Sequence, residues 1–198
     1  MYRFIETIKI ESGTILNLRF HNLRLNATRK HFFGAHISSI QLEDFIVPPI
    51  FEKCLKCRVV YAEQIEDITY SVYQMREVKT LKLVFSNAIE YSYKSENREA
   101  IQKLFVERGL QDEVLIVRDG LLTDTSIANV ALYNGSEWIT PASSLLAGTK
   151  RAELLTYKII READIPVDSL FSYSKIALFN AMIDFKVLIL PINKLTIF

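Results

Sequence analysis

The sequence has little that points to nucleic acid, to a membrane or to export. Its 198 residues hold 24 Lys and Arg against 23 Asp and Glu, a net charge of +1. No basic or acidic field therefore favours a nucleic acid or a membrane surface as partner. The chain opens without a signal-peptide pattern, and no apolar run approaches the ~20 residues that a membrane-spanning helix needs. We expect a soluble, cytoplasmic protein.

Cysteine and histidine are also scarce. Cys54 and Cys57 form a Cys-Leu-Lys-Cys pair, but the chain offers neither a second ligand pair for zinc nor a thioredoxin-like context. The histidines, His21, His31 and His36, lack metal-ligand spacing. We expect no metal site, and we interpret both cysteines as structural thiols where a short helix meets a strand.

What is present is the pattern of a mixed helix and strand fold. Alternating and β-branched runs predict strands near residues 2–10, 15–18, 58–62, 68–75, 81–85, 88–93, 113–117, 129–133, 138–140, 175–179 and 186–190. Four helices are expected. The first runs from Asn22 to a stop at Gly34, and the second follows Pro48-Pro49 and contains Phe51 and Leu55. The third runs from Ser95 to a stop at Gly109, and the fourth starts at Thr149 with its inward face formed by Ala152, Leu155 and Ile159.

Strands and helices without regular alternation favour an α+β fold. The chain shows no repeat, low-complexity segment or flexible linker, and the least patterned stretch is 76–79. We therefore expect two domains, a smaller one over 1–78 and a larger one over 79–198.

One combination of residues suggests cofactor chemistry. Lys94 stands at a predicted strand-to-helix junction, where an amine can be held rigidly toward a cleft. Asp124 follows in a turn-rich stretch, and Gly148-Thr149-Lys150 precedes a predicted helix, whose amides could bind phosphate. A pyridoxal-phosphate site needs a lysine for the Schiff base, an acid facing the pyridine nitrogen and donors for the phosphate. Spacing alone leaves this a hypothesis.

The chain resembles the class IV, or fold type IV, aminotransferases over nearly its whole length. Residues 4–8 are similar to the family's opening Phe-Glu-Thr-Ile strand, and 21–25 to its His-x-x-Arg-Leu helix. Residues 94–98 match the Lys-x-x-Asn-Tyr/Arg segment that carries the Schiff-base lysine. Residues 123–129 are similar to Thr-Glu-x-x-x-x-Asn, and 146–151 to Leu-x-Gly-Ile-Thr-Arg.

The resemblance implies pyridoxal 5′-phosphate as cofactor and a role for particular residues. Lys94 would carry the cofactor and act as general base and acid, Asp124 would face the pyridine nitrogen, and Arg24 would bind the phosphate. The full set of cofactor-binding residues expected is Arg24, Lys94, Asp124, Ser126, Thr149 and Lys150.

The sequence also departs from the family pattern. Asp124 replaces the family's glutamate and is one methylene shorter, and Thr149-Lys150 replaces an Ile-Thr pair, which moves the hydroxyl one position earlier. Lys150 either adds charge at the phosphate or points to solvent. The usual N-terminal Asp-Arg-Gly and Tyr-Gly-Asp-Gly elements are absent, and we interpret Asn180, near the family's Gly-Thr-Ala loop, as structural.

The resemblance further implies a two-domain fold type IV enzyme that holds its cofactor between the domains, acts on a small amino substrate and forms a homodimer. Arginine after asparagine in Asn97-Arg98 favours a 4-amino-4-deoxychorismate lyase, which forms 4-aminobenzoate and pyruvate for folate biosynthesis. Two alternatives stay open: a branched-chain or D-amino-acid aminotransferase, and a non-catalytic member that only binds a ligand. Arg98 could meet a substrate carboxylate, but we expect it to point to solvent.

Overall fold

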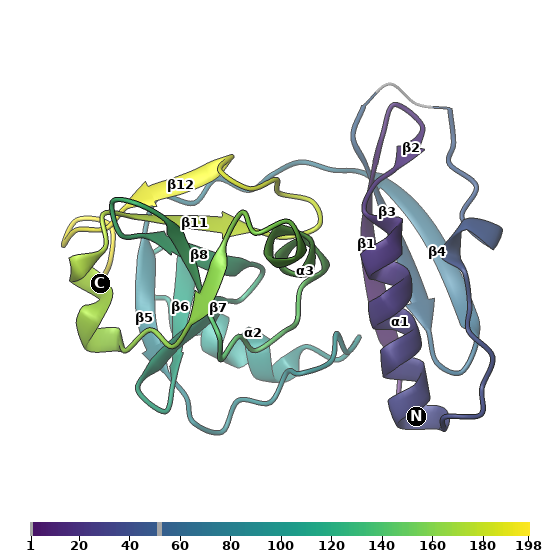
Figure 1. The fold of residues 1–198 in the computed structure, drawn as a ribbon, viewed down its shortest axis with the longest axis horizontal. Helices are drawn as coiled ribbons and strands as arrows, with labels where there is room; N and C mark the ends of the chain where they lie inside the picture. Colours follow the sequence, from purple (N-terminus) through teal and green to yellow (C-terminus); the bar gives the residue numbers. More distant parts are fainter. Residues whose placement is uncertain (1, 51–52) are drawn as a thin grey trace. The chain divides into compact units, whose positions relative to one another are not determined.

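The computed structural model describes residues 2–50 and 53–198, and its contacts divide the chain into two compact units (Figure 1). The N-terminal unit runs to Gln74 and includes Tyr93–Asn97; the C-terminal unit holds Met75–Ser92 and Arg98–Phe198. The expected domains, 1–78 and 79–198, differ from this division in two respects.

The first difference is the position of the break, which falls after Gln74. The second is that Lys94 groups with the N-terminal unit, because the backbone around it pairs with the first strand. The amide of Ile5 donates to the carbonyl of Lys94 at 2.9 Å, and the amide of Glu96 donates to the carbonyl of Arg3 at 2.9 Å.

The N-terminal unit is an antiparallel sheet in the order β2-β1-β3-β4. Figure 1 shows α1 lying lengthwise along one side of this sheet. The elements of this unit are β1 (Phe4–Glu11), β2 (Thr14–Ile15), α1 (Leu18–Phe33), the 3-10 helix η1 (Leu42–Asp44), β3 (Leu55–Tyr61) and β4 (Ile65–Val72).

Alternation along β1 builds the core of this unit. Phe4, Ile8 and Ile10 share one face of the strand and pack in one buried cluster with Leu25 of α1. Glu6 has the same parity and is also fully buried, so a carboxylate sits at a position that the strand pattern reserves for apolar side chains.

Local capping explains where α1 begins and ends. The helix starts at Leu18, after Asn17 in the left-handed conformation (φ 58°), so the expected start at Asn22 is wrong. Asn22 instead lies inside the helix, and its side-chain oxygen accepts from the amide of Leu42 at 2.9 Å. The expected stop at Gly34 is confirmed, with the Gly34 amide donating to the carbonyl of Lys30.

The helix expected after Pro48-Pro49 is not found where the structure describes the chain. Phe51 lies outside the described residues, and Leu55 is the first residue of β3. Cys57 points into the core from β3, and burial raises the pKa of its thiol to about 11. Cys54 precedes the strand, and neither Cys54 nor Cys57 is in a disulfide.

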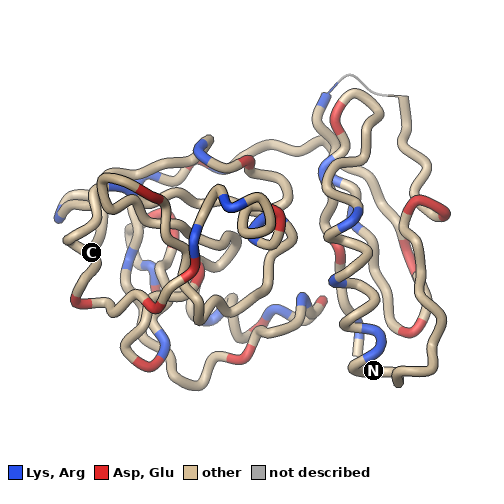
Figure 2. The backbone as a smooth tube through the Cα atoms, viewed as in Figure 1, with Lys and Arg blue, Asp and Glu red and all other residues tan. Residues whose placement is uncertain are grey.

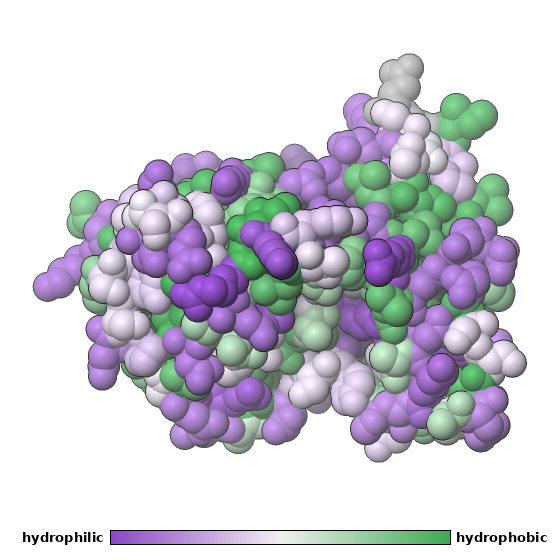
Figure 3. All heavy atoms as spheres, in the orientation of Figure 1, coloured by the Kyte–Doolittle hydropathy of each residue, from purple (hydrophilic) through white to green (hydrophobic). Residues whose placement is uncertain are grey.

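The surface of the N-terminal unit has basic residues along α1 and several exposed apolar side chains. Figure 2 shows Lys and Arg spaced along α1, a helix whose sequence contains no acid. Figure 3 shows apolar residues over parts of the same unit. Its most exposed large apolar side chains include Ile50, Val47 and Leu23.

The C-terminal unit contains two sheets. One has the order β5-β6-β7, with β5 parallel to β6; the other has the order β10-β9-β8-β11-β12. Its elements are β5 (Leu81–Phe85), α2 (Glu99–Val106), β6 (Glu113–Arg118), β7 (Leu121–Thr125), β8 (Asn129–Tyr133), β9 (Trp138–Pro141), α3 (Thr149–Thr156), β10 (Arg161–Ala163), the 3-10 helix η2 (Val167–Ser172), β11 (Lys175–Phe179) and β12 (Leu188–Pro191).

Most expected strands are confirmed, but the one over 88–93 is wrong, and of the one over 15–18 only Ile15 lies in a strand because α1 begins at Leu18. The segment 88–93 is irregular: the side chain of Ile89 packs with Ile101 and Leu104 of α2, and the chain then turns to pair with β1. Because residues 93–97 form this backbone pairing, α2 begins at Glu99 rather than at Ser95.

The inward face of α3 also differs from the expectation. Arg151 and Leu154 are its buried side chains after Thr149, and Leu155 packs only partly against the core. The helix ends at Thr156, so Ile159 lies beyond it and is 49% exposed. Across residues 2–50 and 53–198, no helix is long and apolar enough to cross a membrane.

Candidate active site

The expected site residues are shared by the two units. The N-terminal unit carries a lysine and an arginine, and the C-terminal unit carries the acid and the segment expected to bind phosphate. The two groups are Arg24 and Lys94 in the first unit, and Asp124, Ser126, Thr149 and Lys150 in the second.

A buried polar cluster in the N-terminal unit is centred on Glu6. The Arg24 guanidinium donates to both carboxylate oxygens, with Nε at 2.9 Å from Oε1 and Nη2 at 2.5 Å from Oε2. Nδ1 of His21 lies 2.6 Å from Oε2. His21 and Arg24 are three residues apart on α1, so both reach the same point of β1. This bidentate contact fixes the direction of the arginine side chain.

The charges in this cluster compensate one another. Burial raises the pKa of Glu6, but the charge of Arg24 and the hydrogen bond from His21 outweigh it and hold that pKa at about 2. Burial, Arg24 and Lys94 lower the pKa of His21, against the opposing effect of Glu6. The carboxylate therefore stays ionised at neutral pH.

Lys94 is held by its neighbours in the chain. Its carbonyl accepts from the amide of Ile5, and the Tyr93 ring stacks on His31 with centroids 4.8 Å apart and an interplanar angle of 21°. Tyr93 also meets Phe32 edge-on at 4.8 Å. The backbone that carries the amine is thus fixed by its own carbonyl and by the packing of the preceding side chain.

In the C-terminal unit, Asp124 is a buried acid surrounded by neutral donors. It lies in β7, and its Oδ1 accepts from Nδ2 of Asn129 at 2.9 Å, while its Oδ2 accepts from the amide of Leu146 at 2.9 Å. Among the described residues no Lys or Arg forms an ion pair with it. Burial raises its pKa to about 6, although Leu146, Asn129 and the more distant Arg151 oppose that rise.

Ser126 follows the acid and is anchored through its backbone. Its amide donates to Oε1 of the buried Glu113 at 3.2 Å, and its carbonyl accepts from Nη2 of Arg98 at 2.6 Å. Glu113 is paired in turn with Arg76. The guanidinium of Arg98 is therefore tethered to this loop rather than extended into solvent.

The expected phosphate-binding residues begin α3. Thr149 is buried at the first position, directly after Gly148. The ammonium of Lys150 lies 2.7 Å from Glu153 and 3.5 Å from Asp184, so its charge already has acidic partners. The side chain of Asn180 bonds to backbone atoms of Ile127, Met182 and Ile183.

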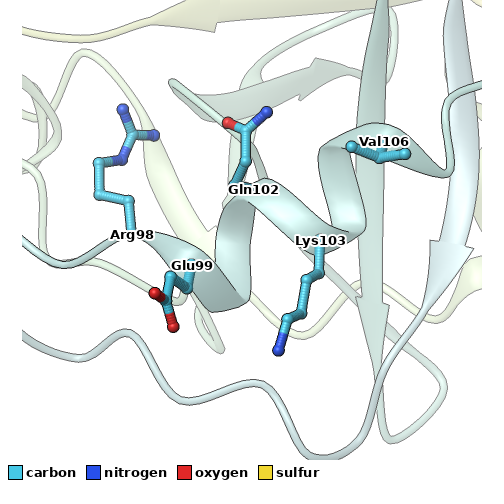
Figure 4. A pocket seen from close by; sticks show the side chains of 5 residues that line it. All are labelled: Arg98, Glu99, Gln102, Lys103 and Val106. Carbon is cyan, nitrogen blue, oxygen red and sulfur yellow. The ribbon is translucent and has the colours of Figure 1, made fainter.

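A surface hollow along α2 does not gather these residues. It is lined by Arg98, Glu99, Gln102, Lys103 and Val106. Figure 4 shows their side chains fanning out from the helix in different directions rather than converging on a point. None of the expected site residues lines this hollow.

The fold and these residues together define the class. The chain has the mixed α+β fold of the type IV pyridoxal-phosphate enzymes. The sequence model of the family Amino-transferase class IV matches residues 95–194, and the chain belongs to this family. It is accordingly a pyridoxal-phosphate-dependent enzyme, as the resemblance implied.

Three similar proteins illustrate the membership. An uncharacterised protein of Haemophilus influenzae is 34% identical over 189 residues, which are 92% of this chain and 98% of the relative. A crystal structure of a "putative 4-amino-4-deoxychorismate lyase" from Haemophilus somnus is 32% identical with a TM-score of 0.87, covering 93% of this chain and 98% of that one. A "putative amino-acid aminotransferase" from Mesorhizobium loti, 22% identical with a TM-score of 0.75 over 93% and 97%, shares the fold.

The donors present fit the cofactor. Asp124 is a buried acid with a raised pKa and only neutral donors in contact, so a protonated ring nitrogen would supply the positive charge that the protein does not place against it. Lys94 offers the primary amine, and the start of α3 offers backbone amides for phosphate.

Two buried acids and their partners were not singled out from the sequence. Glu6 and His21 appear in the matched motifs without a role of their own, and Glu113 was assigned only to a strand. The alternation of side chains along the strand could have identified Glu6. It lies on the apolar face formed by Phe4 and Ile8, and a carboxylate buried there needs a hydrogen-bonding or cationic partner. Asn129 is the last residue of the segment 123–129, and its side-chain amide donates a hydrogen bond to Asp124.

Proposed function

We propose that this enzyme is a lyase of the 4-amino-4-deoxychorismate type, which forms 4-aminobenzoate and pyruvate. The observation that carries the proposal is the similarity to the Haemophilus somnus protein over 93% of this chain, at 32% identity and a TM-score of 0.87. The geometry is compatible with it, because hydrogen bonds hold Arg24 against Glu6 and hold Asp124 against neutral donors before any substrate arrives.

Pyridoxal phosphate, when bound, supplies an electron sink for the carbanion formed at the substrate carbon that bears the amino group. In this proposal, Nζ of Lys94 removes the proton from that carbon and then delivers a proton to the enol-ether oxygen as pyruvate leaves. The carboxylate of Asp124 would accept a hydrogen bond from the ring nitrogen and keep that nitrogen protonated, which lets the ring take up the carbanion's electrons.

The phosphate would be held by two kinds of donor. The backbone amides at Thr149 and Lys150 lie at the N-terminus of α3, where partial positive charge favours an anion. Arg24 keeps a fixed direction through Glu6 and would add a guanidinium. Lys150 contributes less in this proposal, because Glu153 and Asp184 already compensate its charge. Ser126 would contact the cofactor from the loop after the acid.

We further propose that the enzyme works as a cytoplasmic homodimer, as the family resemblance implies. Sedimentation of the purified protein tests the oligomeric state directly. A single species at the monomer mass of 22.8 kDa would contradict the dimer.

The reaction is tested by offering the two substrate sets separately to the cofactor-loaded protein. Pyruvate and 4-aminobenzoate released from aminodeoxychorismate, without added keto acid, are the expected result. Amino transfer that depends on a keto acid, with no 4-aminobenzoate formed, would replace the lyase by an aminotransferase. Lys94→Ala serves as the control, because contaminating activity would survive that substitution.

A further inference from the structure

Asn129 connects the acid to the segment that precedes α3. It is the first residue of β8, and its side chain is buried. One amide group, Nδ2, lies 2.9 Å from Oδ1 of Asp124 and 2.9 Å from the carbonyl oxygen of Leu146. A primary amide has two N–H bonds, so both donors of Asn129 are committed.

The same two partners are joined to each other. The amide of Leu146 donates to Oδ2 of Asp124 at 2.9 Å, which closes a ring of hydrogen bonds through Asp124, Asn129 and Leu146. The carbonyl of Leu146 also accepts from the amide of Gly148 at 2.8 Å. Asp124 cannot rotate without breaking a contact to the turn, and the turn cannot shift without moving the acid.

Gly148 shows how tightly this ring is packed. A Cβ added there would lie 1.9 Å from Oδ1 of Asn129 and 3.1 Å from its Cγ. The backbone of Gly148 has φ −66° and ψ 143°, an ordinary conformation that any residue can adopt. Glycine is therefore required at this position for space and not for backbone freedom, and the asparagine amide occupies that space.

We propose that Asn129 is a positioning residue that locks the Asp124 carboxylate to the Leu146–Gly148 turn, so that the acid and the start of α3 move as one rigid part. Its consequence for catalysis rests on the proposed function, in which Asp124 faces the ring nitrogen and α3 binds the phosphate. The coupling itself depends only on contacts within the C-terminal unit.

The first test measures the pKa of Asp124 in the cofactor-free protein by carbon-13 NMR of its carboxyl group. Asn129→Ala removes one donor to the charged form, so the pKa should rise above its value of about 6, by about one pH unit. Asn134→Ala is the matched control, because the side-chain oxygen of Asn134 accepts hydrogen bonds from Ser136 and Glu137 in the turn between β8 and β9, away from Asp124. An Asp124 pKa that does not move in Asn129→Ala overturns the proposal.

The second test is a double-mutant cycle between Asn129 and Gly148, read out as the dissociation constant for pyridoxal phosphate. Gly148→Ala should weaken binding strongly in the wild-type background. In the Asn129→Ala background the clash is relieved, so the same change should cost about tenfold less. Equal effects in both backgrounds would show that the two positions are not coupled.

Neither result depends on which reaction the enzyme performs. If Asn129→Ala fails to fold, Asn129→Ser leaves a smaller polar side chain, and the same pKa rise and the same relief of Gly148→Ala are expected. If the pKa and the cycle behave as stated but aminodeoxychorismate is not cleaved, the proposed function fails and the role of Asn129 stands.

Discussion

Glu6 in the N-terminal unit and Asp124 in the C-terminal unit are both buried carboxylates, but their electrostatics are opposite. Glu6 is in contact with the guanidinium of Arg24, and its pKa is held at about 2. Asp124 is in contact with a side-chain amide and a backbone amide, and its pKa is raised to about 6. Both are removed from water, so the difference comes from the charge of the partner.

The contrast distinguishes a carboxylate that is paired with a cation of the protein from a carboxylate that is hydrogen-bonded to neutral groups. Glu6 already has its cation, and it uses that contact to orient Arg24. Asp124 is buried at a cost that neutral donors only partly offset, and a cationic ligand would recover that cost on binding. The unit with the compensated acid carries Lys94, and the unit with the uncompensated acid carries the start of α3.

The largest effect is expected for Lys94→Ala. Loss of the proton-transferring amine should lower turnover by about 10²- to 10⁴-fold or more, while the fold is kept, because the backbone and not the side chain of Lys94 pairs with Ile5. Steady-state kinetics measure the loss of turnover, and circular dichroism tests whether the fold is kept. Lys103→Ala, on the exposed side of α2, is the matched control. Borohydride reduction of the wild-type holoenzyme should label Lys94, and recovery of the cofactor on another lysine would contradict the assignment.

Glu6→Gln should be the most destabilising change among the acids. It leaves the guanidinium of Arg24 facing a neutral amide, and breaking such a buried pair costs about 3 kcal/mol of unfolding free energy. Urea denaturation at neutral pH measures the loss. Glu66→Gln breaks the more exposed contact with Arg3 in the same unit and should cost less than about 1 kcal/mol. Equal losses for the two variants would remove the distinction between the buried and the exposed pair.

Asp124→Asn should reduce turnover by roughly 10- to 100-fold, the equivalent of a charged hydrogen bond of about 1.5–3 kcal/mol. Asp164→Asn, at an exposed acid in the same unit, should leave turnover unchanged. Near-normal kcat in Asp124→Asn would show that the ring nitrogen has another partner.

The same variant tests the electrostatics without any cofactor. Because the folded pKa of Asp124 is about 6 and its ordinary value is 3.8, the folded state binds the proton more tightly. This acid therefore destabilises the cofactor-free protein above pH 6, and that cost disappears as the pH falls through 6 to 3.8. The difference in unfolding free energy between wild type and Asp124→Asn should change by about 3 kcal/mol across this range. A constant difference would refute the raised pKa.

The smallest effect is expected for Lys150→Gln. Its ammonium is shared by Glu153 and Asp184, so we expect at most a few-fold weaker binding of pyridoxal phosphate and a stability change of about 1 kcal/mol or less. A fluorescence titration with the cofactor measures the affinity, with the exposed Lys158→Gln as control. A hundredfold loss would instead make Lys150 a principal phosphate ligand.

Local patterns decided much of the fold. The strands around Ile8, Val59 and Ile116 follow from alternating or β-branched runs, and the end of α1 follows from Gly34, because these signals act over a few residues. The alternation over 88–93 predicts a strand that does not form. There the contacts of Ile89 with α2 and of Lys94 with β1 outweigh the local preference.

The sequence by itself indicated the family and singled out Lys94, Asp124 and the residues at the start of α3 as candidates, since the chemistry that each offers lies in one residue and its immediate neighbours. Only the tertiary structure decided that Arg24 is held by Glu6, that Lys94 packs with the N-terminal unit and that Asn129 fixes Asp124 to Leu146. Those contacts join residues far apart in the chain or in different elements. Their geometry, and with it the opposite pKa shifts of Glu6 and Asp124, exists only once the sheets have brought the partners together.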